Sequence, residues 1–285
     1  SMCFLFYVFT LLGSASSVVQ RPNIIVILTD DQDYLLNSTM YQPNLLSKVA
    51  AKGMSFTHGF ANTPVCCPSR SSLLTGKFTH NHGARNNSIA GSCTSPEWSK
   101  QMETDALAVH MQKAGYRSLY AGKYLNHYGE KNTGTGGKEG LAYIPPGWTE
   151  WFGLQGNSRY FNYTVSNNGV AETHQSNYTS DYFTDVLKRR AIKFIQEASQ
   201  YKKSTGQPFF LWVGTPAAHA SFTPAPQYEH TAKGMKAPRT PTWNIVPKDR
   251  HQTVRELTPM TNEQIAESDT IFAQRLGTLR SVDDM

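Results

Sequence analysis

The sequence predicts an α/β fold in which a mainly parallel sheet carries helices on both faces. Residues 23–29 (NIIVILT) and 208–213 (PFFLWV) are uninterrupted apolar runs, which are typical of strands buried on both faces. Residues 182–201 form the longest amphipathic pattern and precede the second of these strands. Strands that alternate with helices indicate a layered fold with a parallel sheet. In such sheets, ligands bind at the carboxyl ends of the strands.

Shorter patterns complete the alternation of helices and strands. Further helices are predicted at 43–52, 68–74, 106–113 and 263–284, and further strands at 54–60 and 117–120. Gly53, Gly76 and Gly115 lie just past three of these helices, where glycine commonly ends a helix. Residues 129–147 and 222–250 are rich in Gly or Pro and are predicted to be irregular.

Composition excludes several classes of protein. Hydrophobic residues make up 39% of the 285 residues and charged residues 17%, with a mean hydropathy of −0.45. These values exclude a protein with many membrane spans and a disordered chain. The 27 Lys and Arg residues exceed the 21 Asp and Glu residues by 27 − 21 = 6. No basic run is interleaved with aromatic residues, so we predict no nucleic-acid partner.

The N-terminal segment predicts export from the cytosol. Residues 3–12 are an uncharged apolar run that is too short to span a membrane, and small residues follow at 13–17. We interpret residues 1–17 as a signal peptide and residues 21–285 as the folded domain; a buried N-terminal strand is the alternative. Four Asn-x-Ser/Thr sequons support secretion and predict glycosylation at Asn37, Asn86, Asn162 and Asn177.

The cysteines are too few for a disulfide scaffold. Cys3 would leave with the signal peptide, which leaves Cys66, Cys67 and Cys93. An odd number in an oxidising compartment indicates that one of them has a role other than a structural one. If Cys66 has that role, Cys67 is free to pair with Cys93, although the sequence does not fix this pairing.

Charged residues follow three of the predicted strands. Asp30 and Asp31 come directly after the strand at 23–29, Lys123 follows the strand at 117–120, and His219 follows the strand at 208–213. Two adjacent carboxylates repel each other and favour a hard cation such as Ca²⁺ or Mg²⁺. For the Asp pair alone, a turn or helix-capping role is an equally good explanation.

Residues 64–77 (PVCCPSRSSLLTGK) contain Cys-x-Pro-Ser-Arg, headed by Cys66, and then Leu-Thr-Gly. This segment resembles the signature of the sulfatase family, whose leading Cys is oxidised to formylglycine by a formylglycine-generating enzyme. The resemblance implies that one hydroxyl of the formylglycine hydrate attacks sulfur and that the other later expels sulfate. The predicted helix agrees with this role, because its N-terminus favours an anion near Cys66. Arg70, one turn further on, would neutralise developing charge.

Other stretches of the sequence indicate which branch of the sulfatase family it resembles. Residues 121–126 (AGKYLN), 146–148 (PGW) and 215–219 (TPAAH) are similar to the N-acetylglucosamine-6-sulfatase branch and, next to it, to the extracellular heparan endosulfatases. The resemblance implies an alkaline-phosphatase-like layered fold. It also implies a sulfuric ester hydrolase that removes 6-O-sulfate from N-acetylglucosamine or glucosamine units of heparan or keratan sulfate. A sulfated glycosaminoglycan would be the substrate, and the lysosome the favoured location, with the extracellular space as the alternative.

The resemblance also implies a role for each matching residue. Asp30 and Asp31 would bind Ca²⁺ together with an oxygen of the modified Cys66. Lys123 would contact the sulfate oxygens, and His219 would contact the sulfate or the ester oxygen and serve as an acid. Asn126 would contact the substrate. The catalytic residues expected are therefore Cys66, Arg70, Lys123 and His219.

The end of the chain departs from the family pattern. A later Asp followed by Asn or His, a second Lys and a smaller C-terminal domain are expected and are not found before residue 285. The sequence therefore resembles the N-terminal portion of a sulfatase, with the C-terminal part missing. We expect residues 1–285 alone to have little activity and to expose an apolar strand edge. Asp283 and Asp284 are interpreted as helical, exposed and not metal-binding.

Two other functions fit the same residues. The fold also suits hydrolysis of another sulfate ester or of a phosphate ester, although Pro-Ser-Arg after the cysteines favours sulfate. Alternatively, the chain is a non-catalytic secreted fragment that binds sulfated glycans through its basic pocket. Formylglycine at Cys66 discriminates an enzyme from a binding fragment.

Overall fold

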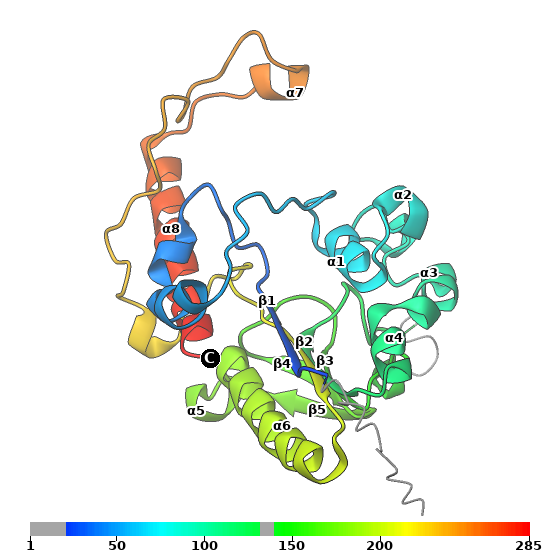
Figure 1. Cartoon of the computed structure of the whole chain (residues 1–285). Coiled ribbons are helices and arrows are strands. Elements are labelled where there is room, and N and C mark those ends of the chain that lie inside the picture. The colour runs from blue at the N-terminus through cyan, green and yellow to red at the C-terminus, as the bar shows by residue number, and fades with distance from the viewer. Residues whose placement is uncertain (1–20, 132–139) are drawn as a thin grey trace, which may run out of the picture.

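The computed structural model describes residues 21–131 and 140–285. The predicted signal peptide and part of the irregular segment 129–147 lie outside these ranges. The described residues form one six-stranded sheet with the order β1-β6-β2-β3-β4-β5 (Figure 1). The strands are β1 (Ile24–Leu28), β2 (Arg117–Lys123), β3 (Glu150–Leu154), β4 (Tyr163–Asn167), β5 (Val170–His174) and β6 (Phe209–Gly214). Strands β1, β6, β2 and β3 are mutually parallel, and β4 and β5 are antiparallel additions at one edge.

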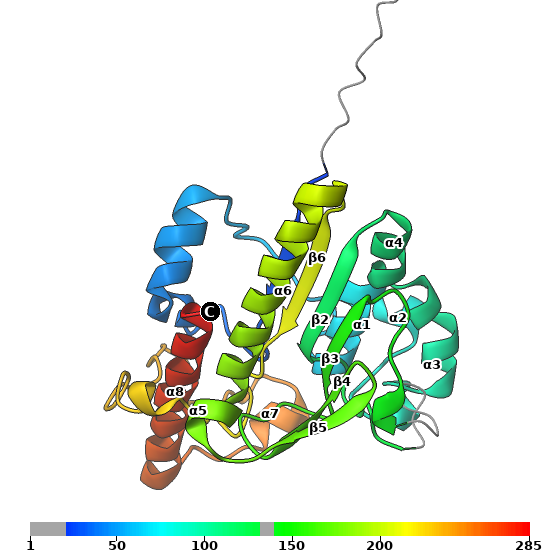
Figure 2. The ribbon, with the colours of Figure 1, turned by 90° about the horizontal axis from the view of Figure 1, so that it is seen from below.

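Helices cover both faces of the sheet (Figure 2). Helix α6 (Phe183–Thr205) packs against β6 and β2 on one face, and α8 (Asn262–Asp283) packs against α6. On the other face lie α1 (Cys66–Thr75), α2 (Thr79–His82), α3 (Pro96–Gln101) and α4 (Leu107–Lys113). The remaining α-helices are the short α5 (Tyr178–Asp181) and α7 (Gln252–Arg255). Single turns of 3-10 or π helix lie at Ser38–Tyr41, Leu45–Val49, Ala50–Lys52, Ile89–Gly91, Glu103–Asp105, Gly140–Ala142 and Pro226–Tyr228.

The central strands are buried on both faces because each contributes to two cores. Leu119 on β2 and Leu211 on β6 pack with the buried side of α6. Their neighbours Tyr120 and Trp212 belong to the opposite core, which is rich in aromatic residues and includes Trp151. Side chains alternate between faces along a strand, so an uninterrupted apolar run is what a sheet covered on both sides requires.

Several predicted elements are confirmed. The strands at 23–29 and 208–213 correspond to β1 and β6, and the helix at 182–201 corresponds to α6. The helices at 68–74, 106–113 and 263–284 correspond to α1, α4 and α8. The predicted helix at 43–52 is present only as a π turn followed by a 3-10 turn.

The predicted strand at 54–60 is wrong. Residues 54–60 contain no strand, and Met54, Phe56 and Phe60 are 78%, 83% and 88% exposed. No strand of the described residues pairs with this segment, and an apolar run without a pairing partner gains nothing from extended geometry. Strands β3, β4 and β5 were not predicted. Asp283 also differs from expectation: it is buried, and its carboxylate accepts hydrogen bonds from the backbone N–H groups of Asn44 and Leu45.

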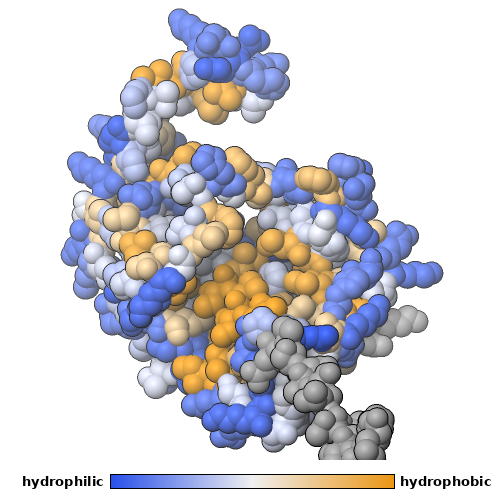
Figure 3. Space-filling model, viewed as in Figure 1, coloured by the Kyte–Doolittle hydropathy of each residue, from blue (hydrophilic) through white to orange (hydrophobic). Residues whose placement is uncertain are grey.

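Strand β1 forms an open edge of the sheet. Among the strands of residues 21–131 and 140–285, it pairs only with β6, and Ile25 and Ile27 are each 49% exposed. Figure 3 shows hydrophobic side chains gathered on the face of the molecule where β1 lies. The expected exposure of an apolar strand edge is therefore confirmed in the part of the chain that the structure describes.

Candidate active site

The register of three parallel strands brings the predicted site residues together. Leu28 of β1 and Gly122 of β2 both pair with Gly214 of β6. Asp30 lies two residues after Leu28 on the chain that leaves β1, and Lys123 lies one residue after Gly122 on β2. Lys123 is the last residue of β2, because the strand extends three residues beyond its predicted end.

The close approach at this level requires glycine. Gly122 has a φ of +111°, and a Cβ there would lie 2.0 Å from the carbonyl oxygen of Gly214. Any other residue at 122 would force β2 and β6 apart. The Gly-Lys pair at 122–123 therefore serves both the strand packing and the placement of the lysine.

Asp30 is a buried carboxylate held by two cations. It is 3% exposed. Its Oδ2 lies 2.6 Å from Nζ of Lys123, and its Oδ1 lies 3.3 Å from Nη2 of Arg70. The hydroxyl of Ser158 donates a further hydrogen bond of 2.6 Å to Oδ2. Burial raises the pKa of Asp30, but the charges of Arg70 and Lys123 outweigh it and lower the pKa below its ordinary value. Asp30 is therefore ionised at neutral pH.

Arg70 is fixed at a second point. Besides Asp30, it donates a 2.7 Å hydrogen bond through Nη1 to the backbone carbonyl of Lys123. Arg70 is 4% exposed and Lys123 is fully buried. Two cations and one carboxylate are thus locked together beneath the carboxyl edge of β1 and β2.

Cys66 lies above this ion cluster. It is the first residue of α1, which begins two residues before the predicted helix at 68–74, and Val65 is the N-cap. Its Sγ lies 4.0 Å from Oδ1 of Asp31, and Nε2 of His219 lies 3.9 Å from Oδ2 of the same residue. Asp31 has a φ of +57°, a left-handed conformation that Asp adopts more readily than most residues. A cavity of about 210 Å³ opens here, lined by Asp30, Asp31, Cys66 and Arg70 among others.

Cys66 and His219 shift each other's protonation. Burial raises the pKa of the Cys66 thiol, but a hydrogen bond from His219 and the charge of Lys123 outweigh it and lower the pKa. The same hydrogen bond raises the pKa of His219 above its ordinary value, against the effect of burial. Around Cys66, the site therefore favours an anionic group beside a protonated imidazole.

The residues present fit a hard cation. Single ligand atoms of Asp30, Cys66 and His219 lie within 4.8 Å of one another, and the carboxylate of Asp31 is beside them. Carboxylate oxygens are the preferred ligands of Ca²⁺. Together with an oxygen at position 66 they would supply part of a calcium site.

Asn126 is not among the residues that meet at Cys66. It is 5% exposed, its backbone carbonyl accepts a hydrogen bond from the Thr94 hydroxyl, and it does not line the cavity beside Cys66. Its side-chain oxygen is buried without a partner among the described residues. Its role as a substrate contact remains a prediction.

A disulfide joins Cys67 to Cys93. The pairing that the sequence left open is therefore present, and Cys66 is the free cysteine of the described residues. The disulfide ties the first turn of α1 to a loop 26 residues away. It thus supports the position of Cys66 while leaving its thiol unpaired.

All four predicted glycosylation sites are accessible. Asn37, Asn86, Asn162 and Asn177 are exposed, as attachment of a glycan requires. Glycosylation itself remains a prediction.

Sequence reasoning missed Glu103, which lies behind the site. It is 1% exposed, and its carboxylate accepts hydrogen bonds from the hydroxyls of Ser99, Tyr124 and Tyr143. Burial raises the pKa of Glu103 above its ordinary value, although these three hydroxyls oppose the shift. Tyr124 directly follows Lys123, so Glu103 anchors the segment that carries the lysine. No motif marks Glu103 in the sequence.

We expect Glu103→Gln to gain stability relative to the wild type as the pH rises from 4 to 7. The folded state holds the Glu103 proton more tightly than the unfolded state, so the stability that this group contributes is lost above its unfolded pKa of roughly 4.3. Glutamine cannot lose a proton and lacks this decline. Urea denaturation of both proteins across this pH range measures the difference, and Glu97→Gln, at an exposed site, is the matched control. Parallel pH profiles for Glu103→Gln and the wild type would contradict the prediction.

The fold and the site together define a class of protein. A layered, mostly parallel sheet with helices on both faces carries a cysteine at a helix N-terminus and a carboxylate–arginine–lysine cluster at its carboxyl edge. This is the alkaline-phosphatase-like fold. Within this class, the chain belongs to the sulfatase family, whose sequence model, described as Sulfatase, matches residues 22–285.

The chain is similar in sequence to several named sulfatases. The chain is 40% identical to N-acetylglucosamine-6-sulfatase of Capra hircus over 275 residues, which cover 96% of this chain and 47% of that protein. It is 40% identical to N-acetylglucosamine-6-sulfatase of Homo sapiens, over 93% of this chain and 47% of that protein. It is 38% identical to the extracellular sulfatase SULF-1 homolog of Drosophila melanogaster, over 95% of this chain and 23% of that protein. The chain thus spans less than half the length of these relatives.

Solved structures agree on the fold. The structure of BT4656 in complex with its substrate D-glucosamine-2-N,6-O-disulfate superposes with a TM-score of 0.65 at 20% identity, covering 93% of this chain and 60% of that one. The phosphonate monoester hydrolase of Agrobacterium radiobacter superposes with a TM-score of 0.51 at 17% identity, covering 93% of this chain and 57% of that one. Within the described ranges, no helix has the length and apolar character needed to cross a membrane.

Proposed function

We propose that the protein is a sulfuric ester hydrolase that removes 6-O-sulfate from glucosamine or N-acetylglucosamine units of a sulfated glycosaminoglycan. The observation that carries the proposal is the position of Cys66. The head of the Cys-x-Pro-Ser-Arg motif stands at the N-terminus of α1, beside Asp31 and His219 and above the pair of Arg70 and Lys123. Two 40% identical relatives bear the name N-acetylglucosamine-6-sulfatase, which supports the choice of substrate.

Each residue of the site has its own role in the proposed reaction. Arg70 and Lys123 provide fixed positive charge where a sulfate group gains negative charge in the transition state. His219, whose pKa is raised in the unmodified chain, holds a proton at Nε2 that it would give to the leaving ester oxygen. Asp30 keeps the two cations in place and, with Asp31, would hold calcium.

Two groups complete this site. Formylglycine made from Cys66 would supply a hydroxyl nucleophile in place of the thiol. Calcium, when bound, would supply a Lewis acid that polarises the sulfate. The formylglycine-generating enzyme is accordingly the proposed maturation partner.

We expect the Cys66 peptide to be about 18 Da lighter than its cysteine form after co-expression with the formylglycine-generating enzyme. Reduction and alkylation followed by mass spectrometry measure this, and Cys67 in the same peptide is the internal control. Only Cys66 has Pro two positions later and Arg four positions later, so Cys67 should be alkylated instead. Two alkylated cysteines would favour the alternative of a non-catalytic glycan-binding fragment.

Calcium is expected to stabilise the folded chain. At one hundred times its dissociation constant it should raise the free energy of unfolding by about 2.7 kcal/mol. Asp31→Asn should reduce this rise, because it removes a carboxylate that is half exposed and positioned beside Cys66. Urea denaturation with and without chelator measures both effects. If calcium raises the free energy of unfolding equally in the wild type and in Asp31→Asn, Asp31 is not a calcium ligand.

We place the protein in the secretory pathway, with the lysosome as the favoured destination and the extracellular space as the alternative. Three observations support this. The four sequon asparagines are exposed, Cys67 and Cys93 form a disulfide, and one relative is an extracellular sulfatase. Disulfides persist mainly in oxidising compartments.

A further inference from the structure

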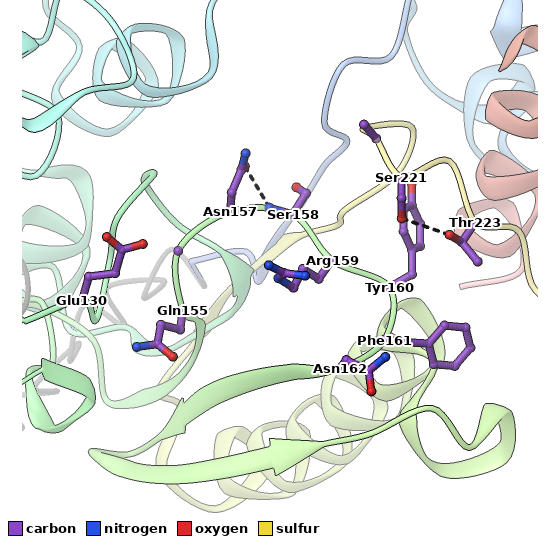
Figure 4. A pocket seen from close by; sticks show the side chains of 12 residues that line it. Glu130, Gln155, Asn157, Ser158, Arg159, Tyr160, Phe161, Asn162, Ser221 and Thr223 are labelled. Atoms are coloured by element: carbon purple, nitrogen blue, oxygen red, sulfur yellow. Dashed lines mark hydrogen bonds between the residues drawn. The ribbon is translucent and has the colours of Figure 1, made fainter.

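A second cavity adjoins the site and has no role in the chemistry described above. Its volume is about 810 Å³, which falls within the roughly 300–1,000 Å³ range of small-molecule sites. The loop between β3 and β4 forms one wall, and residues 220–223, directly after His219, form another. Figure 4 shows the side chains of both segments around this space.

Three consecutive residues connect this cavity to the catalytic cluster. The Ser158 hydroxyl donates to the carboxylate of Asp30. The buried Tyr160 donates through its hydroxyl to the backbone carbonyl of His219, at 3.0 Å. Arg159 lies between these two anchors and is itself exposed. Its Cα is about 3.8 Å from those of its neighbours, so the two anchors hold the backbone of Arg159 close to Asp30 and His219.

Arg159 is the cation of this cavity. It forms no ion pair among the described residues, and its guanidinium extends from the loop toward the side lined by Gln155 and Glu130 (Figure 4). Glu130 contributes the carboxylate of the lining and contacts Nδ1 of His127 at 2.8 Å. A guanidinium presents a fork of donors that matches carboxylate or sulfate oxygens.

The rest of the lining suits a sugar. The cavity is lined by the amide residues Gln155, Asn157 and Asn162 and by the hydroxyl residues Ser221 and Thr223. Amides and hydroxyls both donate and accept hydrogen bonds, which matches sugar hydroxyl groups.

We propose that this cavity binds the sugar adjoining the glucosamine that loses its sulfate, and that Arg159 pairs with an anionic group on that neighbouring sugar. This inference rests on the proposed function, because it takes Cys66 as the reacting centre. It goes further by assigning a substrate preference to the protein: chains with a carboxylate or sulfate on the neighbouring unit are preferred over those with a neutral one.

The test uses isothermal titration calorimetry on the chain with unmodified Cys66, in calcium, so that no hydrolysis occurs. The first probe is 6-sulfated N-acetylglucosamine, and the second carries a hexuronate joined to it. The third has the hexuronate carboxylate reduced to an alcohol. The fourth is the reduced form with a sulfate on that sugar, so it separates carboxylate from sulfate as the partner of Arg159.

We expect the hexuronate disaccharide to bind at least about 10-fold more tightly than either the monosaccharide or the neutral disaccharide, the gain of one charge-assisted hydrogen-bond pair. Arg159→Gln should reduce the affinity for this disaccharide to that for the neutral one, and Arg159→Lys should retain part of the gain. Arg250→Gln, at an exposed arginine of the segment 222–250 that does not line the cavity, is the matched control and should keep the full preference.

Equal affinity for the charged and neutral disaccharides, a preference that survives in Arg159→Gln, or no binding of any probe would each overturn the subsite. Failure of the proposed function has a different signature. In that case the Arg159-dependent preference is present, but Cys66 is never converted to formylglycine. The subsite would then stand as a glycan-binding site on a non-catalytic chain.

Discussion

Asp30→Asn is expected to lower the free energy of unfolding by about 3–5 kcal/mol, because it leaves two buried cations without their anion. Lys123 is fully buried, Arg70 is 4% exposed, and both contact the Asp30 carboxylate. Asparagine has nearly the same shape and keeps one acceptor for the Ser158 hydroxyl. The loss therefore reports the missing charge and not a cavity.

Asp31→Asn is the matched control for this prediction. The Asp31 side chain is 50% exposed, and its contact with His219 is 3.9 Å long. Ion pairs in such positions contribute at most about 1 kcal/mol. Urea denaturation at neutral pH with calcium chelated compares the two variants without any contribution from the metal. If Asp30→Asn and Asp31→Asn lose equal amounts of unfolding free energy, burial of Asp30 does not determine the stability of the cluster.

The sequence does not predict that Asp30 is buried while its neighbour Asp31 is half exposed. The strand at 23–29 and the Asp-Asp pair predicted carboxylates at the sheet edge, because carboxyl ends of parallel strands meet there. Which carboxylate is buried depends on the backbone after β1. Asp31 has a left-handed φ of +57°, which turns the chain so that only Asp30 enters the core. No local pattern predicts that reversal.

The same reasoning explains why Lys123 and His219 were placed correctly at the edge, whereas Ser158 and Arg159 were missed. Strands β2 and β6 have apolar runs that mark their ends. Strand β3 (EWFGL) is short, contains Gly153 and has no alternation. Without β3, the loop that follows it had no position in the fold. The second cavity therefore emerged only from the three-dimensional structure.

The sequence does carry a local signal for strands β4 and β5. Strands β4 and β5 are joined through Asn168 and Gly169, which have φ values of +50° and +87°. Asn-Gly between two extended segments is a strong indicator of a two-residue hairpin turn. Reading 163–174 (YTVSNNGVAETH) in this way would have predicted the antiparallel edge of the sheet.

Cys66→Ala is expected to reduce hydrolysis of a 6-sulfated glucosamine substrate by roughly 10⁴-fold or more, the scale of loss seen when a catalytic nucleophile is removed. Cys66 is the free cysteine of the described residues and stands at the N-terminus of α1 beside His219. Alanine cannot be converted to formylglycine, and it offers no oxygen to a metal. The ratio of kcat values is measured in a form of the protein that hydrolyses this substrate, with modification of the wild type confirmed by mass spectrometry.

The control removes the adjacent sulfur and leaves the nucleophile. The double variant Cys67→Ala with Cys93→Ala eliminates the disulfide and leaves no unpaired thiol in its place. Loss of a disulfide typically costs about 2–4 kcal/mol of stability, so kcat is compared at a temperature at which circular dichroism shows both variants folded. The double variant should retain kcat within about 10-fold of the wild type, since Cys66 keeps the Pro-Ser-Arg that follows it. If the double variant loses as much activity as Cys66→Ala while folded, or if Cys66→Ala keeps a kcat within about 10-fold of the wild type, Cys66 is not the nucleophile.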